Sequence, residues 1–242
     1  MTSSIVRAAL TGLAFSIAAS LALPGHAQTT ANGEWPSYGG DLAHTRYAPF
    51  DQINAGNFGS LEIAWRFSTT NLGPAPEYRF QSTPVMVDGV LYTTGGSRRA
   101  VTALDATTGE QLWVYSLNEG ERGANAARRL SGRGLAFWSK GRDKRVLYVS
   151  PGYQLVALDA ETGRPVESFG KRGVVDLYDT LDQGGDWDKR QIGLHSPPTI
   201  ANGVVIVGAA HTPLSPANQA SNVIGYVRGF DVVTGKHLWT FH

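Results

Sequence analysis

One short pattern occurs three times in this chain, and it limits the possible folds more than any other feature. Each copy has an aspartate (Asp105, Asp159 or Asp231), a threonine three residues later and then a glycine. A carboxylate at the end of a strand accepts hydrogen bonds from turn amides, and glycine adopts the positive φ that the turn requires. Each copy therefore predicts a hairpin between two outer strands of a sheet.

A tryptophan follows two of these turns at the same distance. Trp113 and Trp239 each lie eight positions after the aspartate of their copy. The middle copy has Glu167 at that position, and Phe169 two residues further on is a candidate substitute. A large ring at a fixed place on an outer strand predicts a buried contact between neighbouring repeats.

Short β-rich runs lie before, between and after the turns. They form three sets of four, namely 84–87, 90–94, 101–104 and 111–115; 135–138, 146–149, 154–158 and 164–169; and 198–201, 204–208, 225–230 and 237–241. Asp88-Gly89 and Asn202-Gly203 lie where tight turns between inner strands are expected. A further run, 61–67 with Trp65, is predicted to be an outer strand of a blade that is completed by sequence not present in this chain.

These patterns predict an all-β fold, a β-propeller of four-stranded antiparallel blades, with about three blades and one strand in this chain. The 29 glycines and 12 prolines also favour short strands over helices. Propellers close with roughly four to eight blades, so we expect this chain to be the N-terminal fragment of a longer protein. Binding residues are expected on the long connections 118–134, 170–194 and 211–222.

The N-terminus has a different character. Arg7 precedes an apolar stretch over 8–23, and small residues follow up to Ala27, which is typical of a cleaved signal peptide over 1–27. The stretch is shorter than the roughly 20 apolar residues that span a bilayer. We expect an exported, periplasmic chain, with or without membrane association. Residues 28–60 would lead into the propeller and 61–242 would form it.

The composition excludes several classes of site. There are no cysteines, so the chain itself holds no disulfide, thiolate metal site, catalytic thiol or lipid-modified cysteine. The formal net charge of +1 gives no global field that would favour nucleic acid or an anionic membrane.

Further motifs are similar to those of the pyrroloquinoline quinone (PQQ)-dependent dehydrogenases, the quinoprotein glucose and alcohol dehydrogenases. The tryptophan-bearing repeat resembles the docking motif of that family. Its other landmarks resemble Trp35-Pro-Ser-Tyr-Gly-Gly, Thr45-Arg-Tyr-Ala-Pro, Gln52-Ile-Asn, Phe80-Gln-Ser-Thr-Pro, Gly132-Arg-Gly-Leu-Ala-Phe and Phe169-Gly-Lys-Arg-Gly-Val-Val-Asp-Leu. The last is most similar to the glucose dehydrogenase branch, and the resemblance extends from about residue 33 to residue 242.

The resemblance implies an eight-bladed complete propeller with PQQ near its axis, calcium beside the quinone, and an aspartate that removes the proton of the substrate hydroxyl. It implies three cofactor-binding residues here, Gln81, Arg133 and His195. Arg133 matches an arginine that binds a cofactor carboxylate, and a guanidinium in a Gly-Arg-Gly turn can present a planar fork to such a group. The catalytic aspartate is expected beyond His242, so no catalytic residue is assigned.

Two departures from the family pattern matter. The vicinal cysteine pair of the alcohol-oxidising branch is replaced around Ala127 and Arg128, which favours the glucose-type branch. The stretch 208–213 lacks the acidic metal ligand expected after its strand, so no metal ligand is assigned in this chain.

Other clusters have simpler interpretations. A basic stretch is predicted to be a solvated connection without a nucleic-acid motif; it contains Arg122, Arg128, Arg129, Arg133, Lys140, Arg142, Lys144 and Arg145. An acidic stretch lacks the EF-hand spacing and is predicted to make local turn bonds; it contains Asp176, Asp179, Asp182, Asp186 and Asp188. Apart from the resemblance, His195 and His211 are expected to be structural or surface histidines.

Two functions remain. The favoured one is PQQ-dependent oxidation of a sugar or alcohol hydroxyl in the periplasm, with electrons passed to a respiratory acceptor, either a quinone or a cytochrome. The alternative is a non-enzymatic propeller scaffold of the outer-membrane assembly type. That relative has a lipidated N-terminal cysteine, which is absent here, and lacks the Arg133 and Gln81 landmarks.

Overall fold

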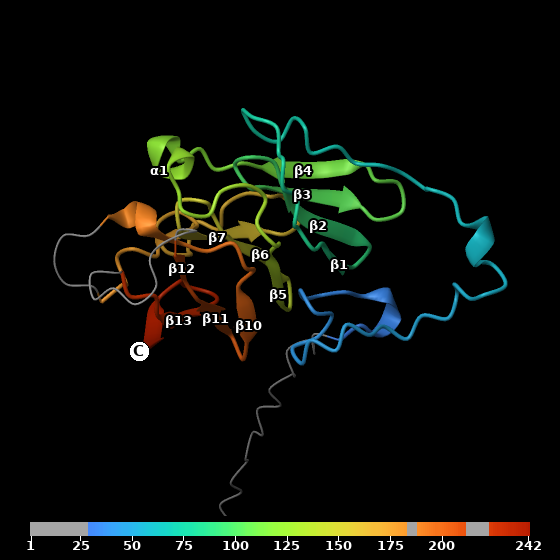
Figure 1. Ribbon diagram of the computed structural model, residues 1–242. Helices are drawn as coiled ribbons and strands as arrows, with labels where there is room; N and C mark the ends of the chain where they lie inside the picture. The colour runs from blue at the N-terminus through green and yellow to red at the C-terminus, as the bar shows by residue number, and fades with distance from the viewer. Residues whose placement is uncertain (1–28, 183–187, 212–222) are drawn as a thin grey trace, which may run out of the picture.

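The computed structural model describes residues 29–182, 188–211 and 223–242, and three four-stranded antiparallel sheets follow one another along the chain (Figure 1). The first blade contains β1 (Val85–Val87), β2 (Val90–Gly95), β3 (Ala100–Asp105) and β4 (Gln111–Tyr115). The second contains β5 (Ala136–Lys140), β6 (Asp143–Val149), β7 (Gln154–Asp159) and β8 (Val174–Asp176). The third contains β10 (Thr199–Ala201), β11 (Val204–Val207), β13 (Val227–Asp231) and β14 (His237–Phe241).

Small elements occupy the connections. β9 (Ile192–Gly193) pairs with β12 (Ala210–His211), and α1 (Gly120–Ala124) lies between the first two blades in the chain. The chain also contains three short 3-10 turns within the described residues, η1 (Ala31–Gly33), η2 (Phe58–Ser60) and η3 (Lys189–Gln191). Figure 1 shows α1 and the orange η3 turn on the same side of the sheets. The expected signal peptide lies outside the described residues, within which no helix is long and apolar enough to cross a bilayer.

The three repeat turns have the predicted chemistry. Asp105 Oδ1 accepts the backbone N–H groups of Thr107 and Thr108 and the hydroxyl of Thr108. Asp159 and Asp231 make the corresponding bonds with the threonine three positions later. The glycine of each copy has a φ between 69° and 74° and donates its N–H to the carbonyl of the same aspartate. The inner turns at Asp88-Gly89 and Asn202-Gly203 also have two positive φ angles each.

The second blade is buried on both faces. Alternate residues of a strand point to opposite faces of the sheet. Val146 and Tyr148 of β6 pack in a core shared with the first blade, whereas Leu147 and Val149 pack in a core shared with the third. This explains why 146–149 of β6 and 155–158 of β7 are continuous apolar runs rather than alternating ones.

A ring from each repeat packs on the turn glycine of the next. A Cβ added to Gly109 would lie 2.5 Å from the Trp65 ring, and one added to Gly163 would lie 2.5 Å from the Trp113 ring. The indole N–H of Trp65 donates to the Ala106 carbonyl at 3.2 Å, and that of Trp113 donates to the Ala160 carbonyl at 3.0 Å. The predicted contact between repeats is therefore present for Trp113, whereas Trp239 is 40% exposed and its predicted buried contact is not confirmed.

In the second blade, Phe169 takes the place that Trp113 has in the first. The strand predicted over 164–169, however, is wrong. Pro165 has no N–H to donate to a ladder, and after a single bridge to Leu158 the chain turns away. β8 returns five residues after Phe169 to pair with β7. Phe169 is fully buried, and its ring lies 3.2 Å from where a Cβ on Gly235 would be.

The strand predicted over 61–67 stays a prediction, because the blade that it would join is expected to be completed by sequence outside this chain. Within the described residues this segment has no ladder partner, and Leu61 and Ile63 are more than half exposed. A strand exists only through its hydrogen bonds to a neighbouring strand, and here only the Trp65 side chain is anchored. Earlier in the chain, Trp35 pairs with Met86 of β1 through two backbone hydrogen bonds of 2.9 Å.

The basic stretch is not uniformly solvated, which corrects the prediction. Arg145 is only 4% exposed and donates to the carbonyls of Val232 and Val233 in the third blade. Arg122 forms a forked pair with the carboxylate of Asp176 at 2.6 and 2.7 Å. Long basic side chains can bury their stems between blades while their nitrogens find carbonyls or carboxylates there.

Candidate functional site

The structure brings together the backbones of the three predicted cofactor-binding residues. The N–H of Arg133 donates to the His195 carbonyl at 2.7 Å, and the N–H of Thr83, two residues after Gln81, donates to the Arg133 carbonyl at 3.1 Å. The N–H of Gln81 itself lies 3.4 Å from Ser131 Oγ. The segments that lead into three successive blades therefore lie side by side, and each contributes one predicted residue.

The Gly-Arg-Gly turn holds Arg133 tightly by its backbone. Gly132 and Gly134 have φ angles of 67° and 126°. A Cβ on Gly134 would lie 2.7 Å from the Thr83 carbonyl oxygen, and one on Gly132 would lie 2.7 Å from Nε of Arg99. Both glycines are therefore needed for close packing. The Arg133 side chain is exposed and has no hydrogen-bond partner among the described residues.

The surroundings of His195 are strongly positive. Burial, together with the positive charges of Arg128, Arg133, Arg99 and Arg79, lowers the pKa of His195 from 6.5 to about 4. His195 is consequently neutral near pH 7. An imidazole that stays neutral beside four guanidinium groups marks a place where positive charge is concentrated.

Two buried polar atoms near this cluster have no partner among the described residues: Arg128 Nε and His195 Nδ1. Buried polar groups normally make hydrogen bonds, so each orphan indicates a missing ligand or solvent molecule. Guanidinium groups bind carboxylates through charge-assisted, often forked, hydrogen bonds. The residues present thus fit an anionic ligand with several carboxylates, such as the quinone that the resemblance implies.

Sequence reasoning missed part of this cluster. Arg79 and Arg99 were not nominated, and Arg128 was noted only as a replacement for a cysteine and a member of the basic stretch. Arg99 bonds to carbonyls as far away as Leu194, and no local spacing reveals such contacts. The only available signal was the position of Arg79 two residues before Gln81.

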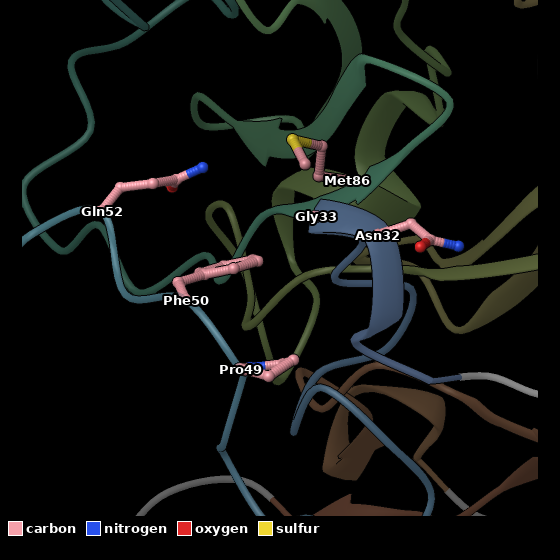
Figure 2. Close-up of a pocket in the computed structure, with 6 residues that line it drawn as sticks. All are labelled: Asn32, Gly33, Pro49, Phe50, Gln52 and Met86. Carbon is pink, nitrogen blue, oxygen red and sulfur yellow. The ribbon is translucent and has the colours of Figure 1, made fainter.

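A separate cavity of about 530 Å³ lies between the N-terminal segment and β1 (Figure 2). It is lined by Asn32, Gly33, Pro49, Phe50, Gln52 and Met86. None of these side chains is titratable, and none belongs to the arginine cluster. We therefore assign the candidate site to the cluster and not to this cavity.

The other sequence clusters have local roles. Asp188 accepts the N–H of Arg190 at the start of η3, and Asp176 accepts the N–H of Tyr178 as well as the Arg122 fork. Local bonding is thus confirmed for Asp188 and, through Tyr178, in part for Asp176, whose Arg122 partner lies 54 positions away. Asp186 lies outside the described residues. His211 Nε2 contacts the Val223 carbonyl, in agreement with a structural role. Within the described ranges, no three His, Asp or Glu side chains are grouped as a metal site.

Comparisons with known proteins agree with the β-propeller fold. The quinone-type alcohol dehydrogenase subunit of Gluconobacter oxydans is 33% identical over 86% of this chain and 24% of its own length. The quinoprotein glucose dehydrogenase of the same organism is 30% identical over 91% of this chain and 28% of its own. The quinohemoprotein alcohol dehydrogenase structure from Comamonas testosteroni superposes with a TM-score of 0.66 at 27% identity, covering 86% of this chain and 27% of that one.

The chain thus spans about a quarter of the length of these relatives. The sequence model of the PQQ family, described as the glucose/ethanol/alcohol dehydrogenase β-propeller domain, matches residues 35–242. That range includes every blade and all of the arginine cluster. The chain belongs to the β-propeller family of the PQQ-dependent glucose, ethanol and alcohol dehydrogenases.

Proposed function

We propose that this protein is a PQQ-dependent dehydrogenase that oxidises a hydroxyl group of an alcohol or a sugar. One observation carries the proposal: the segments bearing Gln81, Arg133 and His195 are hydrogen-bonded together from three blades, inside a cluster of arginines. Family membership supports the cofactor, and the relatives named above are alcohol and glucose dehydrogenases.

The residues of this chain have distinct parts in the proposal. The free guanidinium of Arg133 holds a carboxylate of the quinone, and the unpartnered Nε of Arg128 adds a further donor. Neutral His195 accepts or donates one hydrogen bond without adding charge, and the exposed amide of Gln81 fixes orientation from the neighbouring blade. When bound, PQQ supplies a two-electron acceptor, while the protein supplies binding, orientation and positive potential.

The remaining features of the function extend beyond these residues. We propose a periplasmic location, based on the signal-peptide pattern over 1–27. Calcium would act beside the quinone in the complete protein. The electrons would pass to a respiratory quinone or cytochrome.

Reconstitution of the intact protein with increasing PQQ, in the presence of calcium, tests the proposal. We expect saturable quinone binding by absorbance and dye reduction with alcohols or sugars. Arg133→Lys should raise the half-saturating quinone concentration roughly tenfold to a hundredfold, because one charged hydrogen bond contributes about 1.5 to 3 kcal/mol. Lysine keeps the charge but not the planar fork.

Arg129→Lys is the matched control. Arg129 lies in the same connection and is exposed, and its guanidinium donates a hydrogen bond to the Ala124 carbonyl at 3.3 Å. Its replacement should leave the quinone titration unchanged. Equal titrations for wild type and Arg133→Lys would remove Arg133 from the site, and no quinone binding by the wild type would refute the function itself.

A further inference from the structure

Arg99 is a buried cation that bonds only to backbone carbonyls in the described part of the chain. It lies directly before β3, is 1% exposed and has a φ of 54°. Its three nitrogens donate to four carbonyl oxygens, those of Leu130 at 3.0 Å, Val149 at 2.7 Å, Leu194 at 2.7 Å and Arg128 at 2.9 Å. Removing an ion from water without a paired carboxylate is costly, so four well-formed bonds must compensate.

The equivalent position in the second blade distinguishes two parts of the Arg99 arrangement, namely the contact between blades and the bonds to the segments of the candidate site. Tyr153 is the counterpart of Arg99 in the second blade, six positions before the repeat aspartate and also with a positive φ. Its hydroxyl donates to the Gly208 carbonyl at 2.8 Å. Gly208 is the counterpart of Val149. Val149 lies four residues after Arg145, which pairs with Asp159. Gly208 likewise lies four residues after Val204, which pairs with Asp231. A neutral hydroxyl therefore suffices for the contact between blades.

The other three acceptors of Arg99 have a different location. Arg128 and Leu130 precede Arg133 in the same connection, and Leu194 directly precedes His195. Gly132 packs against the guanidinium, since a Cβ there would lie 2.7 Å from Nε and 3.1 Å from the His195 carbonyl. The guanidinium thus ties the Arg133 turn to the His195 segment from a third element, the β2–β3 hairpin.

We propose that Arg99 is a positioning residue that sets the spacing between the Arg133 turn and the His195 segment. The proposal rests on the proposed function, because these two segments would hold the quinone. Lysine cannot replace Arg99, since one ammonium nitrogen has three hydrogens and cannot reach four carbonyls arranged around a planar fork.

The test compares Arg99→Lys with Arg228→Lys in the intact protein. Arg228 is equally buried and also has neutral partners, the Leu177 carbonyl, the Thr180 hydroxyl and the Tyr153 hydroxyl. None of these partners adjoins Arg133 or His195 in sequence. Both variants should lose thermal stability, but only Arg99→Lys should weaken quinone binding, by roughly tenfold, or about 1.4 kcal/mol.

A double-mutant cycle shows whether Arg99 acts through Arg133. If it does, Arg99→Lys should have much less effect on quinone affinity in the Arg133→Lys background. Additive effects, or equal quinone affinities for wild type and Arg99→Lys, overturn the inference. If Arg99→Lys does not fold, Gly132→Ala displaces the guanidinium without removing it and should weaken quinone binding in the same way.

Hydrogen exchange on the apo protein gives a readout independent of the quinone. The amides of 128–134 and 194–195 should exchange faster in Arg99→Lys than in Arg228→Lys. Equal exchange in the two variants overturns the positioning role whether or not PQQ binds. Faster exchange together with no quinone binding by the wild type would support the role of Arg99 while refuting the proposed function.

Discussion

The packing of Trp113 on Gly163 allows the contact between the first two blades to be measured directly. Trp113 is partly buried and its indole N–H bonds to the Ala160 carbonyl. Trp113→Ala in the intact protein should lower the free energy of unfolding by about 3 kcal/mol, at the low end of the 3 to 5 kcal/mol of a fully buried tryptophan. Trp113→Phe should cost less, because it keeps a ring and loses the hydrogen bond, worth about 1 kcal/mol.

The glycine side of the contact provides the sharper test. Gly163→Ala combines two penalties: a left-handed backbone conformation, about 1 to 2 kcal/mol, and a methyl group 2.5 Å from the Trp113 ring, about 1 to 3 kcal/mol. Gly203→Ala is the control, because Gly203 has a φ of 76° but nothing within 4 Å of an added Cβ. It should show the backbone penalty alone.

Urea denaturation of each variant measures both terms. In the Trp113→Ala background, Gly163→Ala should cost no more than Gly203→Ala, since the ring that it strikes is gone. If the two alanine substitutions cost the same in the wild-type background, within about 0.5 kcal/mol, the reasoning that places Trp113 on Gly163 is refuted.

Three further predictions concern other parts of the chain. Phe169→Ala should cost about 3 to 5 kcal/mol in urea denaturation because Phe169 is fully buried, whereas Phe58→Ala, at a 69% exposed residue, should cost less than about 0.5 kcal/mol. The pKa of His195 is lowered to about 4, so the unfolded chain binds an extra proton between pH 6.5 and about 4, and the free energy of unfolding should fall as the pH drops through this range. His195→Asn should reduce that slope, and an unchanged slope would contradict the burial of His195. Arg122→Ala should lower the free energy of unfolding by about 1 to 3 kcal/mol, because it leaves the half-buried carboxylate of Asp176 without its forked partner. If Arg129→Ala lowers the free energy of unfolding by a similar amount, the fork contributes little to stability.

The blades were predictable because their signals are local. Asp105, Thr108 and Gly109 bond within one turn, and the short buried runs of the inner strands are visible in consecutive positions. The same holds for the two-residue turn at Asn202-Gly203, whose positive φ angles depend on those two residues alone.

The strand predicted over 164–169 shows where such signals end. The strand predicted over 61–67 stays a prediction, since no neighbouring strand lies beside it in the described residues and its blade is expected to be completed outside this chain. Residues 164–169 read as the fourth strand of a blade, whereas Pro165 interrupts the ladder and β8 takes that place. A strand needs a partner, and the partner is a property of the folded chain.

The sequence by itself determined the repeat and the turn chemistry, and its resemblance to a known family singled out Gln81, Arg133 and His195 as candidates. Only the tertiary structure decided that their backbones meet, that His195 lies among arginines, and that Arg99 joins the segments from below the surface. The physical reason is the range of the interactions. Turn bonds connect residues three or four positions apart, whereas the bond from Arg99 to Leu194 spans 95 positions and exists only once three blades have packed together.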